Sequence, residues 1–148
     1  FGRGEMANVT ALATWIAAES RGMRFNLPQN HAEERRSYEL GKRIFFYRGG
    51  THDFSCAACH AEDGKRIRLQ GLPNLSTKGK AAQETMGSWP TYRVSQSALR
   101  TMQHRLWDCY RQQRWPVPEY GSDALTALTV FLQKQAEGGE IKVPSIKR

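Results

Sequence analysis

The run Cys56-Ala57-Ala58-Cys59-His60 constrains this chain more than any other part of its sequence. Two thiols in a C-x-x-C-H arrangement can add to a haem, and the histidine that follows can ligate the iron. A zinc site would require a second close pair of ligands, but only Cys109 remains as a further cysteine. A thioredoxin-like dithiol would require a strand–helix–strand context, which the surrounding sequence lacks. The motif therefore predicts one haem c, attached through Cys56 and Cys59 and ligated by His60.

Composition and hydropathy limit where such a chain can work. The 148 residues suffice for one domain with a core. The apolar fraction of 39% is modest for a chain that must enclose a porphyrin, but a haem supplies much of its own core. No run of about 18 or more apolar residues occurs, so no membrane span is predicted. The first residues do not resemble a signal peptide. Because haem c is attached after export, we expect a periplasmic protein whose signal was removed or lay upstream.

The formal net charge of +8 indicates anionic partners. Basic chains attract nucleic acids, acidic proteins and small anions through the same long-range field. No helix-turn-helix, zinc-finger or RNA-binding motif accompanies the charge, so nucleic acid is not expected. A small anionic substrate or an acidic redox partner suits a haem protein better.

The first part of the chain shows helical periodicity. Apolar residues spaced for one face predict a helix over residues 6–20, which Gly22 ends, and a linker over residues 26–30. A second helix is predicted over residues 33–47. Gly41 lies in its middle, where a glycine is unfavourable and indicates a close crossing with another helix.

The region after the haem motif is rich in glycine and proline. Residues 64–91 are predicted to form a loop over a haem edge, with a short helix near Ala81. Pro73 in this loop is expected to brace the proximal ligand His60.

The last part of the chain is again helical. We expect a third helix over residues 98–113 and a last helix over residues 122–138, with Phe131 near the Gly41 crossing. Residues 140–148 are predicted to be an extended, basic tail. Because strand signals are scarce, the predicted fold class is all-α, a c-type cytochrome domain.

The iron of the predicted haem needs a ligand on its second face. Met86, Met102, His104 and Cys109 all follow the haem motif. A methionine is the usual ligand of an electron carrier, although methionine also commonly fills gaps in a core.

Cys109 is the cysteine left over after haem attachment, which indicates either an intermolecular disulfide or a reactive thiol. Arg105 precedes it by four residues, so both side chains share one face of the predicted helix. A guanidinium at that position would favour the thiolate and could bind an anion. The alternative is a buried, unreactive cysteine on a helix whose arginines are solvated.

The segment His104-Arg105-Leu106-Trp107-Asp108-Cys109-Tyr110-Arg111 resembles SoxA, the catalytic cytochrome subunit of the SoxAX complex. The likeness covers about residues 33–138. Residues 11–22 resemble the closing helix of an earlier cytochrome-like domain of SoxA. The resemblance therefore implies two parts, a closing helix and linker over residues 1–30 and a catalytic cytochrome c domain over residues 31–148.

The resemblance also implies a function, that of an L-cysteine S-thiosulfotransferase in periplasmic sulfur oxidation. Such a protein couples thiosulfate to a cysteine thiol of a SoxYZ-like carrier, while electrons leave through haem c. By position, Cys109 would be both the distal iron ligand and the active-site sulfur, often found as a persulfide. Arg105 would bind the substrate anion, and His60 would be the proximal ligand. A SoxX-like cytochrome is the implied partner subunit.

Other functions remain open on the sequence alone. One is a plain electron-transfer cytochrome with Met86 as ligand, another is a thiosulfate dehydrogenase that forms tetrathionate, and a third is a haem-based sensor. For the enzyme, a docking groove above Cys109 would have aromatic walls, for which the candidates are Trp107, Tyr110, Trp115 and Tyr120.

Overall fold

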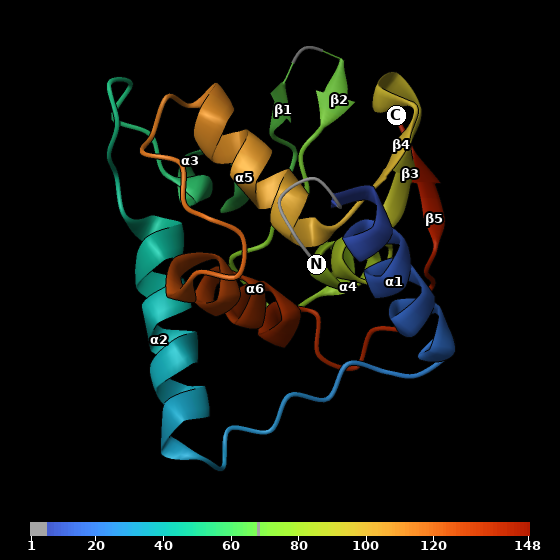
Figure 1. Cartoon of the computed structure of the whole chain (residues 1–148). Coiled ribbons are helices and arrows are strands. Elements are labelled where there is room, and N and C mark those ends of the chain that lie inside the picture. Colours follow the sequence, from blue (N-terminus) through green and yellow to red (C-terminus); the bar gives the residue numbers. More distant parts are fainter. Residues whose placement is uncertain (1–5, 68) are drawn as a thin grey trace.

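The described part of the chain folds into six α-helices and two small sheets (Figure 1). The computed structural model describes residues 6–67 and 69–148, so residues 1–5 of the predicted first part and residue 68 of the predicted loop lie outside the described residues. The helices are α1 (Met6–Glu19), α2 (Ala32–Phe46), α3 (Cys56–His60), α4 (Lys80–Met86), α5 (Met102–Gln112) and α6 (Asp123–Gln135). The strands are β1 (Arg66–Ile67), β2 (Gln70–Gly71), β3 (Thr91–Arg93), β4 (Ala98–Arg100) and β5 (Ser145–Lys147). The predicted all-α class is confirmed in that helices dominate the fold, although two small sheets are present.

Helices α2 and α6 cross at Gly41, where their backbones come into contact (Figure 1). A β-carbon built on Gly41 would lie 2.0 Å from the carbonyl oxygen of Ala127 and 2.9 Å from the β-carbon of Phe131. The ring of Phe131 packs 5.1 Å from that of Phe45, centroid to centroid. The predicted close crossing is thus confirmed, and its cause is steric because no larger residue fits at Gly41.

Helix α6 supplies most of the core. Ser122 caps its first turn by accepting a hydrogen bond from the backbone N–H of Leu125 at 3.5 Å. Its buried apolar residues recur at helical spacing and face α2, α4 and α5. They are Leu125, Ala127, Leu128, Phe131 and Leu132.

The predicted helix over residues 98–113 is wrong at its beginning. Residues 98–100 form β4, which pairs with β3 in antiparallel register, and Ser97 adopts a left-handed conformation with φ of 47° in the connection. Helix α5 begins only after Thr101, whose hydroxyl accepts a hydrogen bond from the N–H of His104 at 3.2 Å. Strand pairing therefore overrides the helical spacing in this segment, and a threonine cap marks the true start of α5.

The predicted extended tail contains a strand. Strand β5 runs parallel to β3, so β3 is central in a three-stranded sheet with the order β4-β3-β5. The hydroxyls of Thr91 and Ser145 lie 2.8 Å apart between the two strands, and Thr91 is fully buried. The tail therefore forms an edge strand of this sheet.

Residues 22–25, which follow α1, run antiparallel to residues 138–141 near the other end of the chain. Phe25 donates a backbone hydrogen bond to Gly139 at 2.9 Å, and Ile141 donates one to Met23 at the same distance. Several large side chains of α1 stay exposed, among them Leu12, Trp15 and Ile16. The division into residues 1–30 and 31–148 stays a prediction.

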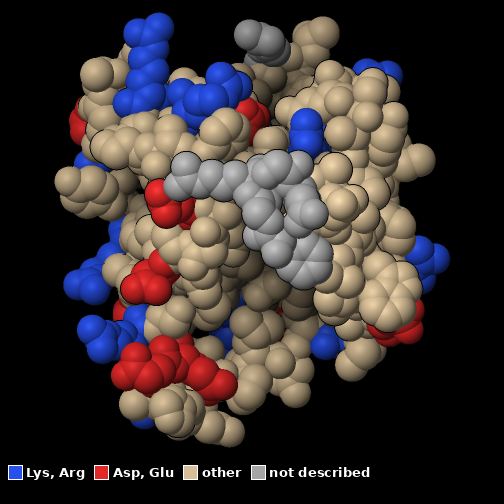
Figure 2. Space-filling view, viewed as in Figure 1, with Lys and Arg blue, Asp and Glu red and all other residues tan. Residues whose placement is uncertain are grey.

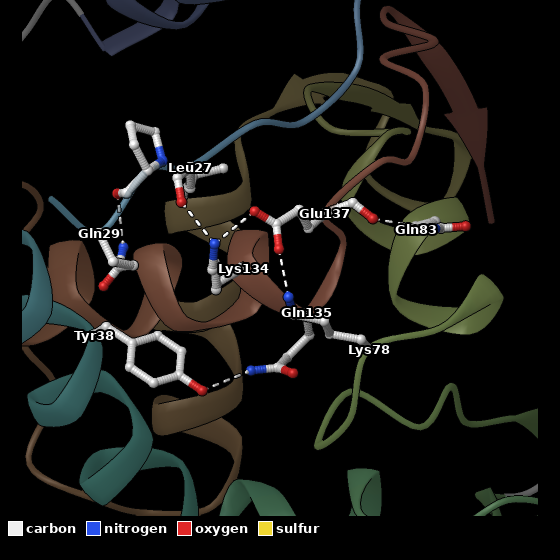
Figure 3. A network of polar contacts seen from close by, with 9 residues as sticks. Leu27, Gln29, Tyr38, Lys78, Gln83, Lys134, Gln135 and Glu137 are labelled. Carbon is white, nitrogen blue, oxygen red and sulfur yellow. Dashed lines mark hydrogen bonds and ion pairs between the residues drawn. The ribbon is translucent and has the colours of Figure 1, made fainter.

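A group of polar contacts fixes the end of α6 to two loops (Figure 3). The ammonium group of Lys134 donates to the carbonyl oxygen of Leu27 at 2.7 Å and to the carboxylate of Glu137 at 2.5 Å. Lys78, in the loop before α4, pairs with the same carboxylate. The side-chain amide of Gln83 in α4 donates to the backbone carbonyl of Glu137 at 3.0 Å. These contacts hold the linker and α4 against α6.

Charge is unevenly distributed over the surface. In the face shown in Figure 2, Lys and Arg gather over the outer end of α5, whereas Asp and Glu lie mostly on the side of α2. Among the described residues, no helix combines the length and the apolar composition that a membrane crossing requires.

Candidate functional site

A cavity of about 590 Å³ lies between α3, α5, α6 and the segment that carries β2 and α4. Cys56, Cys59 and His60 of α3 line it. Cys109 and Arg105 of α5 line the same cavity. The structure therefore brings together all five side chains that the sequence singles out, although α3 and α5 are more than forty residues apart.

The Cys-Ala-Ala-Cys-His run forms the single helical turn α3. Ser55 caps it, because its hydroxyl accepts a hydrogen bond from the N–H of Ala58 at 3.0 Å. The Nδ1 of His60 lies 2.8 Å from the carbonyl oxygen of Pro73, which leaves Nε2 as the ring nitrogen available to a ligand. The predicted bracing of His60 by Pro73 is confirmed, and it runs through the proline carbonyl.

Asp108 organises the arginines around Cys109. Its carboxylate accepts hydrogen bonds from Arg111 at 2.8 Å and from Gln112 at 2.6 Å, and it lies 3.5 Å from the guanidinium of Arg105. Burial raises the pKa of Asp108, but the hydrogen bonds and the arginine charges outweigh it and lower that pKa overall. Asp108 therefore stays ionised and fixes Arg105 on the cavity side of α5.

Burial has the largest effect on the pKa values of the cavity thiols Cys56 and Cys109. It raises the pKa of Cys56 to about 12. Burial also raises the pKa of Cys109, although Arg105 acts in the opposite direction. Arg105 favours the thiolate of Cys109, as expected, but desolvation of the buried thiol has the larger effect and favours the protonated form. Burial lowers the pKa of His60, with a smaller contribution of the same sign from Arg105.

The structure separates the four candidates for a distal ligand. Met86 lies in the core, 3% exposed, and does not line the cavity. His104 also lies outside it, because its Nδ1 is 2.9 Å from the hydroxyl of Tyr120 on the outer side of α5. Met102 and Cys109 remain, and both line the cavity.

The aromatic residues near Cys109 fall into two groups. Tyr110 and Trp115 line the cavity, with their rings 4.9 Å apart in an edge-to-face arrangement. Trp107 and Tyr120 instead stack with His104 away from the cavity. The proposed aromatic walls therefore do not form one surface.

Two cationic residues of the cavity could not be predicted from the sequence. Arg93 of β3 and Lys147 of β5 both line the cavity. The tail appeared to be only a solvated basic segment in the sequence, and nothing there indicates that β5 pairs with β3. The alternation of apolar and polar residues in Ser145–Lys147 is too short to reveal it.

The donor set of the cavity fits a covalent haem. Two thiols and an imidazole with a free Nε2 occupy one turn, and a further thiol enters the cavity from α5. The remaining surface of the cavity is largely apolar, as a porphyrin requires, and includes Phe45, Leu75, Leu128 and Leu132.

The sequence is similar to several curated proteins over nearly its whole length. It is 51% identical to the L-cysteine S-thiosulfotransferase subunit SoxA of Hydrogenophilus thermoluteolus over 99% of the chain and 53% of that protein. It is 37% identical to a protein of the same name from Hydrogenobacter thermophilus over 93% of the chain and 53% of that protein. The chain thus spans about half the length of the curated relatives it matches. No protein-family model matches it.

Two solved structures are similar to the chain in fold. The crystal structure of SoxXA from P. pantotrophus superposes on 95% of the chain with a TM-score of 0.79 and 30% identity, and the match covers 50% of that structure's chain. The thiosulfate dehydrogenase TsdBA from Marichromatium purpuratum superposes on 80% of the chain with a TM-score of 0.50 and 21% identity, which supports a shared fold.

Proposed function

We propose that this chain, which belongs to the SoxA family over the half of those proteins that it spans, couples thiosulfate to a cysteine thiol of a SoxYZ-like carrier. The observation that carries the proposal is the convergence of Cys109 and Arg105 with the Cys56–Cys59–His60 turn on one cavity. A cavity with a nucleophilic sulfur and a cation beside an electron-transfer centre suits oxidation of a sulfur anion.

In this proposal, Cys56 and Cys59 hold one haem c, and His60 and Cys109 are its iron ligands. When bound, the haem accepts the electrons that the reaction releases. The hydrogen bond between His60 and Pro73 fixes the imidazole ring and its tautomer, which is the usual task of a second-layer contact at a metal ligand.

Arg105 binds the sulfonate oxygens of thiosulfate, since a guanidinium presents two parallel N–H groups to an oxyanion. Asp108 holds that guanidinium in place from the same helix. The Cys109 sulfur forms an S–S bond with the sulfane sulfur of thiosulfate as two electrons leave. The deprotonated carrier thiol then attacks that sulfane sulfur, which breaks its bond to Cys109, so the carrier keeps the thiosulfonate group and Cys109 leaves as a thiolate.

The overall reaction balances as an oxidation. The sulfane sulfur of thiosulfate and the carrier thiol sulfur form one S–S bond, the thiol loses its proton, and two electrons leave. The electrons pass to an acceptor, for which we propose a SoxX-like cytochrome subunit. The basic surface over α5 in Figure 2 supports an acidic partner on that side. A periplasmic location goes with haem attachment after export.

The test is the variant Cys109→Met. We expect a folded haem protein that no longer couples thiosulfate to the carrier, because methionine can ligate iron but cannot accept a sulfane sulfur. Tyr110→Phe is the matched control, since it alters the next cavity residue without touching a thiol. Coupling retained by Cys109→Met would overturn the proposal.

Product analysis separates this function from that of a thiosulfate dehydrogenase. The proposed enzyme forms a carrier-bound product and needs the carrier thiol. A dehydrogenase forms tetrathionate from thiosulfate and an electron acceptor alone.

A further inference from the structure

Arg93 and Lys147 are neighbours on one face of the sheet. They are register partners in the parallel pair β3 and β5. Two residues earlier, Thr91 and Ser145 share a hydrogen bond on the same face, whereas the residues between, Tyr92 and Ile146, are exposed on the opposite face. Because side chains alternate along strands, Arg93 and Lys147 both project toward the cavity, which they line.

Neither cation has an acidic partner among the described residues. No ion pair or side-chain hydrogen bond joins Arg93 or Lys147 to any of them. The carboxylate among the cavity residues is that of Glu84, which lies 3.8 Å from Lys80. Two adjacent cations that form no ion pair repel each other, and this repulsion favours an anion between them.

Arg93 also lies in the field of the groups around Cys109. Burial lowers the pKa of Arg93, Arg105 lowers it further, and Asp108 and Cys109 act in the opposite direction. Burial likewise lowers the pKa of Lys147 and Arg93 adds to that effect, whereas the carboxylate of Glu84 acts in the opposite direction. Arg93 therefore lies near Arg105 and Cys109, and the strand register places Lys147 next to Arg93.

We propose that Arg93 and Lys147 complete, with Arg105, a three-cation site that binds the sulfonate end of thiosulfate beside Cys109. The inference rests on the proposed function for the identity of the anion. A tetrahedral dianion carries enough charge and enough oxygen atoms to engage all three side chains, whereas one guanidinium satisfies only two oxygens. The guanidinium of Arg93 donates hydrogen bonds in fixed directions, whereas the ammonium group of Lys147 acts as a compact positive charge.

The test measures equilibrium binding of thiosulfate and of sulfate to the haem-loaded protein by isothermal titration calorimetry, without carrier or electron acceptor. The variants are Arg93→Gln and Lys147→Gln. Arg100→Gln and Lys142→Gln are the matched controls, because they remove the same charges from residues that do not line the cavity. We expect the cavity variants to weaken binding of both anions about tenfold each, and the controls to change it less than about twofold. Arg93→Lys should recover part of the lost affinity, because it restores the charge but not the parallel N–H groups of the guanidinium.

Two results would overturn the inference. If the control variants weaken binding as much as the cavity variants, the effect belongs to the general positive field. If the cavity variants leave anion binding unchanged but shift the midpoint potential and visible spectrum, the two cations serve the carboxylates of the haem.

The same data keep this inference apart from the proposed function. Anion binding that depends on Arg93 and Lys147 supports the site even if the protein fails to couple thiosulfate to a carrier thiol. Coupling with a normal KM in both variants supports the function and overturns the three-cation site.

Discussion

The indole Nε1 of Trp115 donates a hydrogen bond of 2.7 Å to the carbonyl oxygen of Gly49. The contact joins the loop after α5 to the turn that precedes the haem motif. Gly50 adopts a positive φ of 71°, and a β-carbon there would lie 2.0 Å from the Trp115 ring. The ring of Trp115 thus fills the space beside the turn and also lines the cavity.

Replacing this indole should loosen the cavity. We expect Trp115→Phe to lose the hydrogen bond and lower the free energy of unfolding by about 1–2 kcal/mol. Thermal unfolding of the haem-loaded protein measures it. The control is Trp15→Phe, at a residue that is 63% exposed, which should leave Tm unchanged. Equal effects in the two variants would contradict a structural role of the indole.

The α2–α6 crossing should not tolerate even one methyl group. Gly41→Ala places a β-carbon against the backbone of Ala127, so we expect a loss of about 2–4 kcal/mol in urea unfolding. Gly79→Ala is the control, because its β-carbon would meet nothing within 4 Å and its backbone is extended. A stable Gly41→Ala variant would show that the two helices can separate without cost.

The carboxylate of Asp108 should contribute more to stability than an exposed one. Asp108→Asn removes the charge that Arg111 and Arg105 face, and we expect a loss of about 1–2 kcal/mol at pH 7. Asp53→Asn, which affects an exposed pair with Arg48, should cost less than about 0.5 kcal/mol. If the two losses are equal in denaturant unfolding, burial of Asp108 has no energetic consequence.

The contacts at the end of α6 predict a dependence of stability on pH. Hydrogen bonds from Lys134 and Lys78 lower the pKa of Glu137 below its value in the unfolded chain. A lowered folded-state pKa stabilises the protein above the unfolded-state pKa, and this stabilisation is lost as pH falls through the folded-state value. We therefore expect Glu137→Gln to lower Tm by about 1–2 °C at pH 7, and this difference to shrink as the pH falls through the folded-state pKa of Glu137. A difference in Tm that persists in acid would contradict the ion-pair explanation.

The position of Met86 predicts the outcome of a ligand test. Met86→Leu should leave the visible spectrum of the bound haem unchanged and cost less than about 1.5 kcal/mol, because the side chain belongs to the core. Met102→Leu, at a cavity residue, is the companion variant. A spectral change in Met86→Leu alone would instead support a plain electron-transfer cytochrome with Met86 as the iron ligand.

The sequence predicts the helices and the turn of the haem motif well, because each depends on local features. Helical spacing places α2 and α6, the glycine at position 41 marks their crossing, and the Arg105–Cys109 spacing places both side chains at one cavity. These properties follow from residues close in sequence.

The sheet escapes prediction because its information is non-local. Strands β3 and β5 are three residues each and more than fifty residues apart, and neither has enough alternation to reveal a partner. The start of α5 was misplaced for the same reason, since β4 exists only through its pairing with β3. Arg93 and Lys147 could not be recognised as neighbours without that register.

The order of the elements along the chain has a consequence for assembly. The turn with Cys56 and Cys59 precedes α6 and β5, which close the cavity around it. A chain that is exported N-terminus first therefore presents both thiols before the segments that bury them have emerged. Haem can thus be attached to the two cysteines after export and before the domain has folded, and packing of α6 on α2 then encloses it.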